Sequence, residues 1–145
     1  MTGLNHVGIA VRNLDDAVAI FKEKFGLPVT DIIDWPSNGI KVGIINTGNS
    51  ILELMEPLDK NGTVAKFLEK QGRNAVHHLA FAVDKDLSVV GEEMKNLGID
   101  MVYPSPKMGV LGHPVNFCHP KFTGDILIEL SEVGYESRAR KEITS

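Results

Sequence analysis

Cysteine is nearly absent from this chain of 145 residues, and a single one, Cys118, leaves no possibility of an intrachain disulfide. No apolar run approaches the ~20 residues that cross a bilayer. The first residues also lack the charged-then-apolar pattern of a signal peptide. These absences lead us to expect a cytoplasmic protein that does not associate with membranes. Within an apolar strand, the Cys118 thiol is expected to be buried and inert rather than a nucleophile.

Positive charge is also scarce, because 15 basic residues face 19 acidic ones and the net charge is -4. Nucleic-acid-binding proteins present a basic face, so no nucleic acid partner is expected. Glycine-rich phosphate loops, paired Cys-x-x-Cys motifs and Gly-x-Ser-x-Gly elbows are missing from the sequence. Phosphate-loop enzymes and triad hydrolases are therefore not supported.

What the sequence does contain is an internal repeat. Residues 4–11 align with residues 76–83, and at the same offset Val18 meets Val90 and Gly26 meets Gly98. Each half ends on a similar apolar segment, residues 51–54 in the first and 127–130 in the second. The repeat predicts two copies of one module within an ordinary globular composition, 43% hydrophobic and 23% charged.

Apolar periodicity and turn residues predict the order β-α-β-β-β in each half. In the first half we expect strands at 4–11, 29–34, 40–46 and 50–56, with a helix from Asn13 to about Phe25 that Gly26 ends. In the second half we expect strands at 76–83, 100–103, 114–118 and 125–131, with a helix at 87–97. A linking helix at 63–71, capped by Thr63, is expected between them. These elements predict a single domain at 1–134, with modules at 4–57 and 76–131, and a polar tail at 135–145.

One His and one Glu fall at matching places in each half: His6 with Glu53, and His78 with Glu129. Alternation along a strand turns each Glu away from its apolar neighbours. If the last strand of a module lies beside its first, the His and Glu of that module face the same hollow. Two imidazoles and two carboxylates suit cobalt, nickel, manganese or zinc, and such an ion can polarise a carbonyl oxygen.

A single His or Glu in a strand is more often structural than functional. The repeated order of His then Glu favours a shared metal site instead. By alternation, His77 points away from His78, and we expect it to be supporting or structural. His113 and His119 fall in loops.

Several stretches resemble a known superfamily, the vicinal oxygen chelate proteins, which share tandem βαβββ modules with the order His…Glu…His…Glu. Within it the chain resembles the methylmalonyl-CoA epimerase family. The similar stretches cover about residues 4–131 and are residues 6–11, 37–42, 52–57, 64–70, 77–81, 117–121 and 126–130. The resemblance implies an α+β fold whose two modules form one domain, with a curved mixed sheet around a central metal site.

The resemblance also implies an activity, the interconversion of (2R)- and (2S)-methylmalonyl-CoA. A proton would be removed alpha to the thioester carbonyl, and a metal, by resemblance cobalt, would stabilise the enolate. Glu129 matches a metal-ligating carboxylate proposed as a base in that family. Members of the superfamily with one chain of this size commonly pair as homodimers.

The chain departs from some members of the family at two positions. Val42 stands where those members carry a Glu, and valine cannot transfer protons. Glu53 stands where they carry a Gln as metal ligand, so we expect Glu53 to act as the second base. Lys121, in the segment His-Pro-Lys, is our candidate for a contact with the coenzyme A phosphates. Two alternatives stay open: a glyoxalase I acting on a glutathione hemithioacetal, and a non-catalytic binding protein of the same fold.

Overall fold

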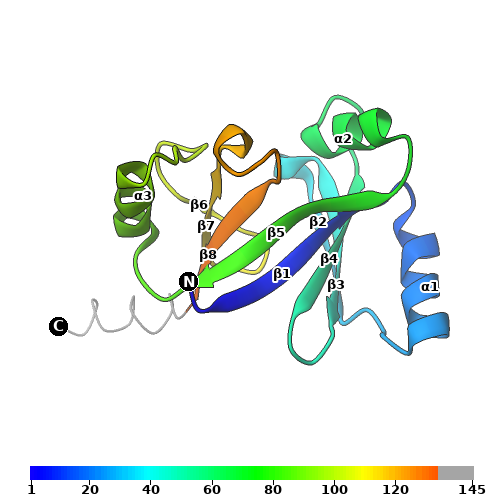
Figure 1. Cartoon of the computed structure of the whole chain (residues 1–145). Coiled ribbons are helices and arrows are strands. Elements are labelled where there is room, and N and C mark those ends of the chain that lie inside the picture. Colours follow the sequence, from blue (N-terminus) through cyan, green and yellow to red (C-terminus); the bar gives the residue numbers. More distant parts are fainter. Residues whose placement is uncertain (134–145) are drawn as a thin grey trace. The chain divides into compact units, whose positions relative to one another are not determined.

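The computed structural model describes residues 1–133 of the chain (Figure 1). The predicted tail at 135–145 lies outside the described residues. The chain divides into two compact units, one formed by His6–His78 and the other by Met1–Asn5 together with the chain from Leu79 onward. The single domain at 1–134 stays a prediction.

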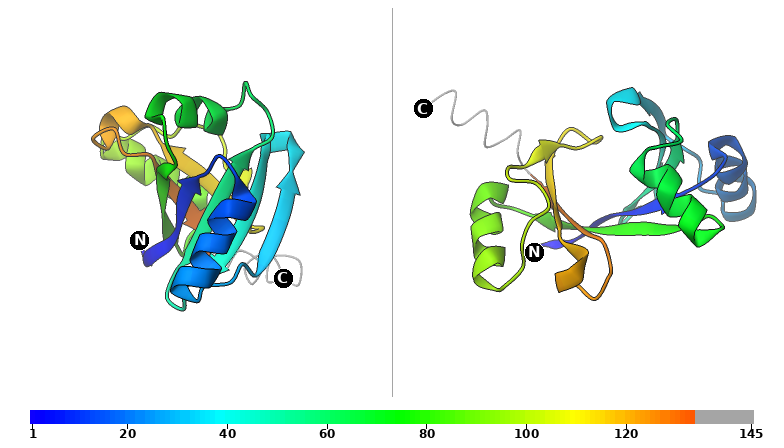
Figure 2. Two further views of the ribbon diagram at one scale, coloured as in Figure 1. Left: turned by 90° about the vertical axis from the view of Figure 1, so that its right-hand side faces the viewer. Right: turned by 90° about the horizontal axis from the view of Figure 1, so that it is seen from above.

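The unit His6–His78 contains a four-stranded sheet in the order β2-β3-β4-β1. Strands β1 and β4 are parallel, and the other neighbours are antiparallel. Helix α1 packs against β3 and β4, and the left view of Figure 2 shows it in front of the strands of its own unit. The elements are the greater part of β1 (Gly3–Ala10), α1 (Leu14–Phe25), β2 (Asp31–Trp35), η1 (Pro36–Asn38), β3 (Ile40–Asn46), β4 (Ile51–Pro57), α2 (Thr63–Gln71) and the start of β5 (Ala75–Val83).

The other unit repeats this plan with the strand order β5-β8-β7-β6. Strands β5 and β8 are parallel, and β8, β7 and β6 are antiparallel neighbours. Its elements are the end of β5, α3 (Leu87–Asn96), β6 (Lys107–Met108), β7 (Pro114–Cys118), η2 (Pro120–Phe122) and β8 (Ile128–Glu132). The predicted α+β fold of two βαβββ modules is therefore confirmed.

Helix α1 begins and ends where its sequence predicts. The Asn13 side chain accepts a hydrogen bond from the backbone N–H of Asp16 at 2.9 Å, which satisfies one donor of the first turn. Gly26 ends the helix in the left-handed conformation, with φ at 66°. The apolar face of the helix packs on the sheet, where the fully buried cluster contains Val11, Leu14, Ala17, Ile45 and Leu54.

Replacing Asn13 with Ala is expected to lower the free energy of unfolding by about 1 kcal/mol, because the Asp16 N–H loses its capping acceptor. Urea denaturation followed by circular dichroism measures the change. Asn13→Ser is the matched control, since serine also caps helices well and is expected to keep most of the stability. Equal stability of Asn13→Ala and the unaltered protein would contradict this account.

Several predicted boundaries are wrong. The strand expected at 125–131 is β8 at Ile128–Glu132, and the strand expected at 29–34 is β2 at Asp31–Trp35. Helix α2 has Gly62, not Thr63, as its N-cap, and Thr63 is already the first helical residue. The expected strand at 100–103 is reduced to one bridge between Met101 and Cys118. The reason lies in Asn116, whose side chain accepts from the backbone N–H of Tyr103 at 3.0 Å and donates to its carbonyl at 3.1 Å. Pro104 then follows without an N–H of its own, so the segment continues as a bend.

Cys118 is buried in the core of its unit with Val83, Leu87, Val90 and Leu130. Burial raises the pKa of its thiol, so the group stays protonated at neutral pH, as the sequence predicts for an inert cysteine. Within residues 1–133, no helix combines the length and the apolar character that crossing a membrane requires.

Candidate metal centre

The pairing of β1 with β4 places His6 and Glu53 on the same face of their sheet. Glu53 is the direct partner of Gly8, which lies two residues after His6 in the same strand. Side chains two residues apart in a strand share a face, so His6 projects to the side on which Glu53 lies. The prediction that the first and last strands of a module lie side by side is confirmed in this unit, where β1 pairs with β4.

The leucines that flank Glu53 explain why its carboxylate faces away from the helix. Leu54 is fully buried in the cluster beneath α1, and Leu52 packs against that cluster. Because alternate side chains point to opposite faces, the same leucines that fix β4 on the core turn Glu53 to the other side. The sequence Leu-Glu-Leu therefore positions a carboxylate by burying its neighbours.

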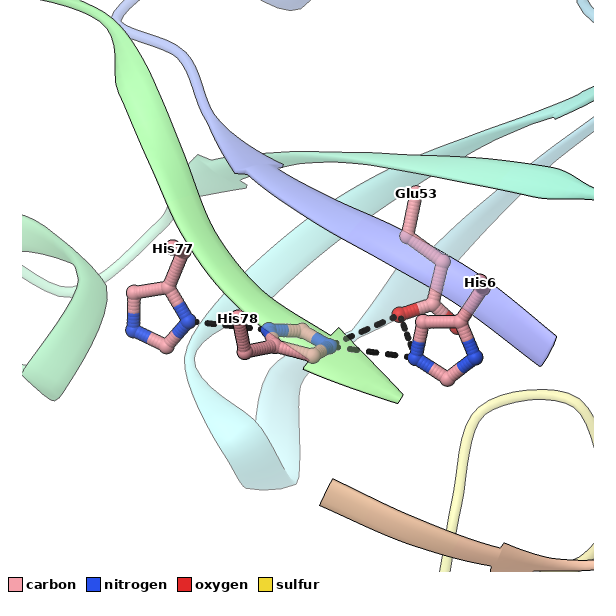
Figure 3. Close-up of polar contacts among 4 residues, drawn as sticks. All are labelled: His6, Glu53, His77 and His78. Atoms are coloured by element: carbon pink, nitrogen blue, oxygen red, sulfur yellow. Dashed lines mark hydrogen bonds and ion pairs between the residues drawn. The ribbon is translucent and has the colours of Figure 1, made fainter. Parts of the chain in front are cut away.

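His6, Glu53 and His78 form one tight cluster (Figure 3). The Nε2 atoms of His6 and His78 lie 3.1 Å apart. Oε2 of Glu53 lies 3.2 Å from Nε2 of His6 and 3.8 Å from Nε2 of His78. All three side chains are buried, with exposures of 2%, 5% and 4% in chain order. Three lone-pair-bearing atoms thus converge at one buried point.

Gly8 makes room for the imidazole of His78. A Cβ built on Gly8 would overlap the His78 ring, whose Nε2 would lie only 2.7 Å away. Close approach of this kind is a known use of glycine within a strand. The sequence prediction did not include Gly8, although an isolated glycine in an apolar strand is the signal that indicates such an approach.

Replacing Gly8 with Ala is expected to weaken cation binding at least about 10-fold, because the added methyl displaces the His78 ring from its donor position. Competition with a chromophoric chelator measures the affinity. Gly91→Ala in α3 is the matched control: its Cβ would meet Met101 at an ordinary 3.6 Å, and the helix gains about 1 kcal/mol from the better helix former. Unchanged cation affinity of Gly8→Ala would contradict this role.

Burial keeps the imidazoles in the form that binds cations. The pKa of His78 is held well below its usual value, chiefly by desolvation and further by the neighbouring His6 and His77. Burial also lowers the pKa of His77 to about 4. Both rings are therefore neutral at pH 7, and a neutral imidazole offers a lone pair to a metal ion without first losing a proton.

The cluster fits a divalent first-row ion. Ligand atoms about 2.1 Å from one ion and about 90° apart are separated by roughly 3 Å. Here the Nε2 atoms of His6 and His78 are 3.1 Å apart, and Nε2 of His6 is 3.2 Å from Oε2 of Glu53. Nitrogen and carboxylate donors together suit cobalt, nickel, manganese or zinc rather than calcium. The buried charge of Glu53 also makes a positive partner favourable at this point.

Glu129 belongs to the other compact unit, where it takes the place that Glu53 takes in the first. It is the direct partner of Ala80, and the repeat aligns Ala80 with Gly8, the partner of Glu53. Glu129 is buried at 6% exposure, while Leu130 joins the core of its unit and Ile128 packs against that core. The two modules therefore hold their glutamates by the same alternation and the same register.

His77 contacts His78 although the two neighbours alternate along β5. Their Nδ1 atoms lie 3.0 Å apart. Figure 3 draws this contact as a dashed line between the two rings. His78 is buried and His77 partly exposed, so the predicted alternation holds for the backbone, but the rings turn toward each other. The ring-to-ring contact is a feature that strand periodicity alone could not predict.

Val42 lies on the same face of the first sheet as Glu53. It pairs with Met55 in β4, and the next residue on its face, Ile44, pairs with Glu53. Val42 is completely buried. Lys121, by contrast, lies on the surface in η2, with its Nζ 4.9 Å from the centre of the Phe122 ring.

Comparison with known proteins identifies relatives across most of the chain. A family model described as the Glyoxalase/Bleomycin resistance protein/Dioxygenase superfamily matches residues 5–117. Human mitochondrial methylmalonyl-CoA epimerase is 36% identical over 129 residues, which cover 89% of this chain and 73% of that protein. An ethylmalonyl-CoA/methylmalonyl-CoA epimerase of Cereibacter sphaeroides is 36% identical over 131 residues, 90% of this chain and 97% of that protein.

Solved structures share the fold. The crystal structure of methylmalonyl-CoA epimerase from Mycobacterium tuberculosis has a TM-score of 0.85 and 33% identity, with 94% of this chain and 91% of that chain covered. A methylmalonyl-CoA epimerase in complex with methylmalonyl-CoA and NH4+ has a TM-score of 0.84 and 28% identity, with 92% and 96% covered. The similarity therefore spans both modules.

Proposed function

The chain belongs to the Glyoxalase/Bleomycin resistance protein/Dioxygenase superfamily, and on that premise we propose that it is a metal-dependent epimerase that interconverts (2R)- and (2S)-methylmalonyl-CoA. One observation carries the proposal: the buried cluster of His6, Glu53 and His78 occurs in a chain whose relatives over most of its length are epimerases of this substrate. These relatives are isomerases, and they favour the epimerase over the glyoxalase I and the binding protein that the sequence left open.

The proposed metal ligands are His6, Glu53 and His78 from the cluster, with Glu129 as the fourth. The matching register of Glu129 in its own module supports its inclusion. When bound, a divalent cation acts as a Lewis acid that stabilises negative charge on the thioester oxygen of the substrate. By resemblance to the epimerase family we propose cobalt, with nickel, manganese and zinc as the other ions that these donors suit.

The proposed proton transfers use two carboxylates. Inversion at C2 needs one group that removes the proton from one face and another that delivers a proton to the opposite face. Val42 has no group that can carry a proton, and it lies on the face of the sheet where Glu53 is fixed. We therefore assign one transfer to Glu53 and the other to Glu129.

Lys121 is proposed to contact the phosphates of coenzyme A. Its ammonium group lies at the surface, next to the Phe122 ring, and is available to an anion. The turn that carries it is fixed by His119, whose Nδ1 accepts from the backbone N–H of Lys121 at 3.4 Å. Solved relatives with acyl-CoA ligands support an acyl-CoA partner for this chain.

We further propose that the protein works as a homodimer in the cytoplasm. The homodimer is proposed by resemblance to the single-chain members of the superfamily. The single buried cysteine, which forms no disulfide within the chain, supports a reducing compartment such as the cytoplasm. Light scattering coupled to size exclusion measures the mass in solution, and a mass of one chain at micromolar concentration would contradict the dimer.

Hydrogen exchange at C2 of methylmalonyl-CoA tests the activity. The protein is incubated with the substrate in heavy water as purified, after chelator treatment and after cobalt is added back, and NMR follows the C2 proton. Deuterium incorporation that depends on the cation is the expected result. Absence of exchange in a protein shown to contain a cation would overturn the proposal that the protein is an epimerase. A parallel assay with methylglyoxal and glutathione would then decide whether the site is a glyoxalase.

A further inference from the structure

His77 makes two ring contacts, one with His78 of the metal cluster and one with Phe67 of α2. Its Nδ1 lies 3.0 Å from Nδ1 of His78. Its ring packs edge-to-face against Phe67 of α2, with the centroids 4.8 Å apart and the planes at 76°. The His77 ring therefore lies between Phe67 of α2 and the ring of His78, and it contacts both.

A hydrogen bond between two ring nitrogens contains one proton, so one ring donates and the other accepts. Nε2 of His78 is the atom that faces His6 and Glu53, at 3.1 and 3.8 Å. A neutral imidazole that offers Nε2 to a cation must carry its proton on Nδ1. In the metal-binding state His78 is therefore the donor of the contact with His77, and His77 must be the acceptor.

We propose that His77 is a positioning residue, which accepts the Nδ1–H of His78 and thereby holds the Nε2 lone pair of His78 toward Glu53 and His6. The role rests on the metal site of the proposed function. It assigns His77 a defined tautomer, with its own proton on Nε2. Most metal-binding histidines donate their second N–H to a carboxylate, a carbonyl or water, and here a second imidazole takes that place.

Two substitutions separate hydrogen bonding from packing. Asn has an oxygen close to where the His Nδ1 lies and keeps an acceptor, whereas Leu fills space beside Phe67 without one. Affinities for Zn²⁺ and Co²⁺ are measured by chelator competition, which does not depend on catalysis. We expect His77→Leu to bind both ions 10- to 100-fold more weakly, a range typical of lost partners of metal ligands, and His77→Asn to stay within about 3-fold of the unaltered protein.

Equal affinities of the Leu variant and the unaltered protein would overturn the role. A loss in His77→Asn as large as the loss in His77→Leu would also overturn it, because the retained acceptor would then have no effect on cation binding. NMR of the unaltered, ¹⁵N-histidine-labelled protein with Zn²⁺ gives a second test that needs no variant. We expect the proton on Nδ1 of His78 and on Nε2 of His77, and a proton on Nδ1 of His77 would overturn the proposal. If the unaltered protein binds neither ion, the metal site itself is wrong and the inference falls with it.

Discussion

Removal of the divalent cation is expected to slow C2 exchange of methylmalonyl-CoA by roughly 10³-fold or more. The reason is electrostatic: negative charge that develops on the thioester oxygen loses a counterion worth several kcal/mol, and each 1.36 kcal/mol corresponds to about tenfold in rate. The measurement is the initial exchange rate in heavy water before and after dialysis against a chelator, with metal content determined by mass spectrometry.

Removal of the cation also has a consequence for stability. A cation at 100 times its Kd stabilises the folded state by about 2.7 kcal/mol, so chelation is expected to lower Tm. The His6→Ala variant lacks one ligand of the cluster and should show little further shift on chelation. His119→Ala is the matched control, because His119 is exposed and outside the cluster, and it should retain the cation. A fully active protein that contains no cation would contradict the proposed role of the metal.

The metal cluster could be predicted from the sequence because it depends on two robust patterns. Period-two alternation turns Glu53 away from Leu52 and Leu54, and the internal repeat pairs His6 with His78. Neither pattern requires knowledge of long-range packing. The same two patterns also predict the order of strands and helices in both modules, which the structure confirms.

Other features depend on contacts between distant residues, which local sequence patterns do not predict. The segment 100–103 has the composition of a strand, yet the Asn116 side chain takes both backbone hydrogen bonds of Tyr103 and leaves only one bridge. Similarly, the space beside Gly8 has a function only once β5 brings the His78 ring there. Both depend on residues far away in the sequence, so they become visible only in three dimensions.

Val42 and Glu53 are best understood together. The resemblance to the epimerase family places Val42 at a position where some members carry a Glu. In this chain that side chain is apolar and completely buried, and the next residue on its face, Ile44, is the strand partner of Glu53. The Val42 side chain has no group that can accept or donate a proton, and it is not exposed to water. We therefore expect Glu53, whose Oε2 lies 3.2 Å from Nε2 of His6, to carry out one of the two proposed proton transfers.

Glu53→Gln is expected to reduce epimerisation by roughly 10²- to 10⁴-fold, the range typical for loss of a general base or acid. Gln keeps the shape of the side chain and an oxygen ligand, so the cation should stay bound. Epimerisation is measured by stereospecific assay of each epimer, and exchange at C2 is followed separately for (2R)- and (2S)-methylmalonyl-CoA. Glu56→Gln, in the same strand but on the opposite face, is the matched control and should leave both rates unchanged.

Measuring exchange separately for each epimer tests the role of Glu53 as a base more directly than a loss of epimerisation rate does. With two bases on opposite faces of the substrate, the loss of one leaves the other able to remove and return its own proton. Glu53→Gln should therefore still exchange one epimer without inverting it, and Glu129→Gln should still exchange the other. Loss of exchange for both epimers in Glu53→Gln would mean that its charge serves the metal rather than a proton. A metal-bound Glu53→Gln that epimerises at the normal rate would exclude Glu53 as a base and require a proton carrier outside the cluster.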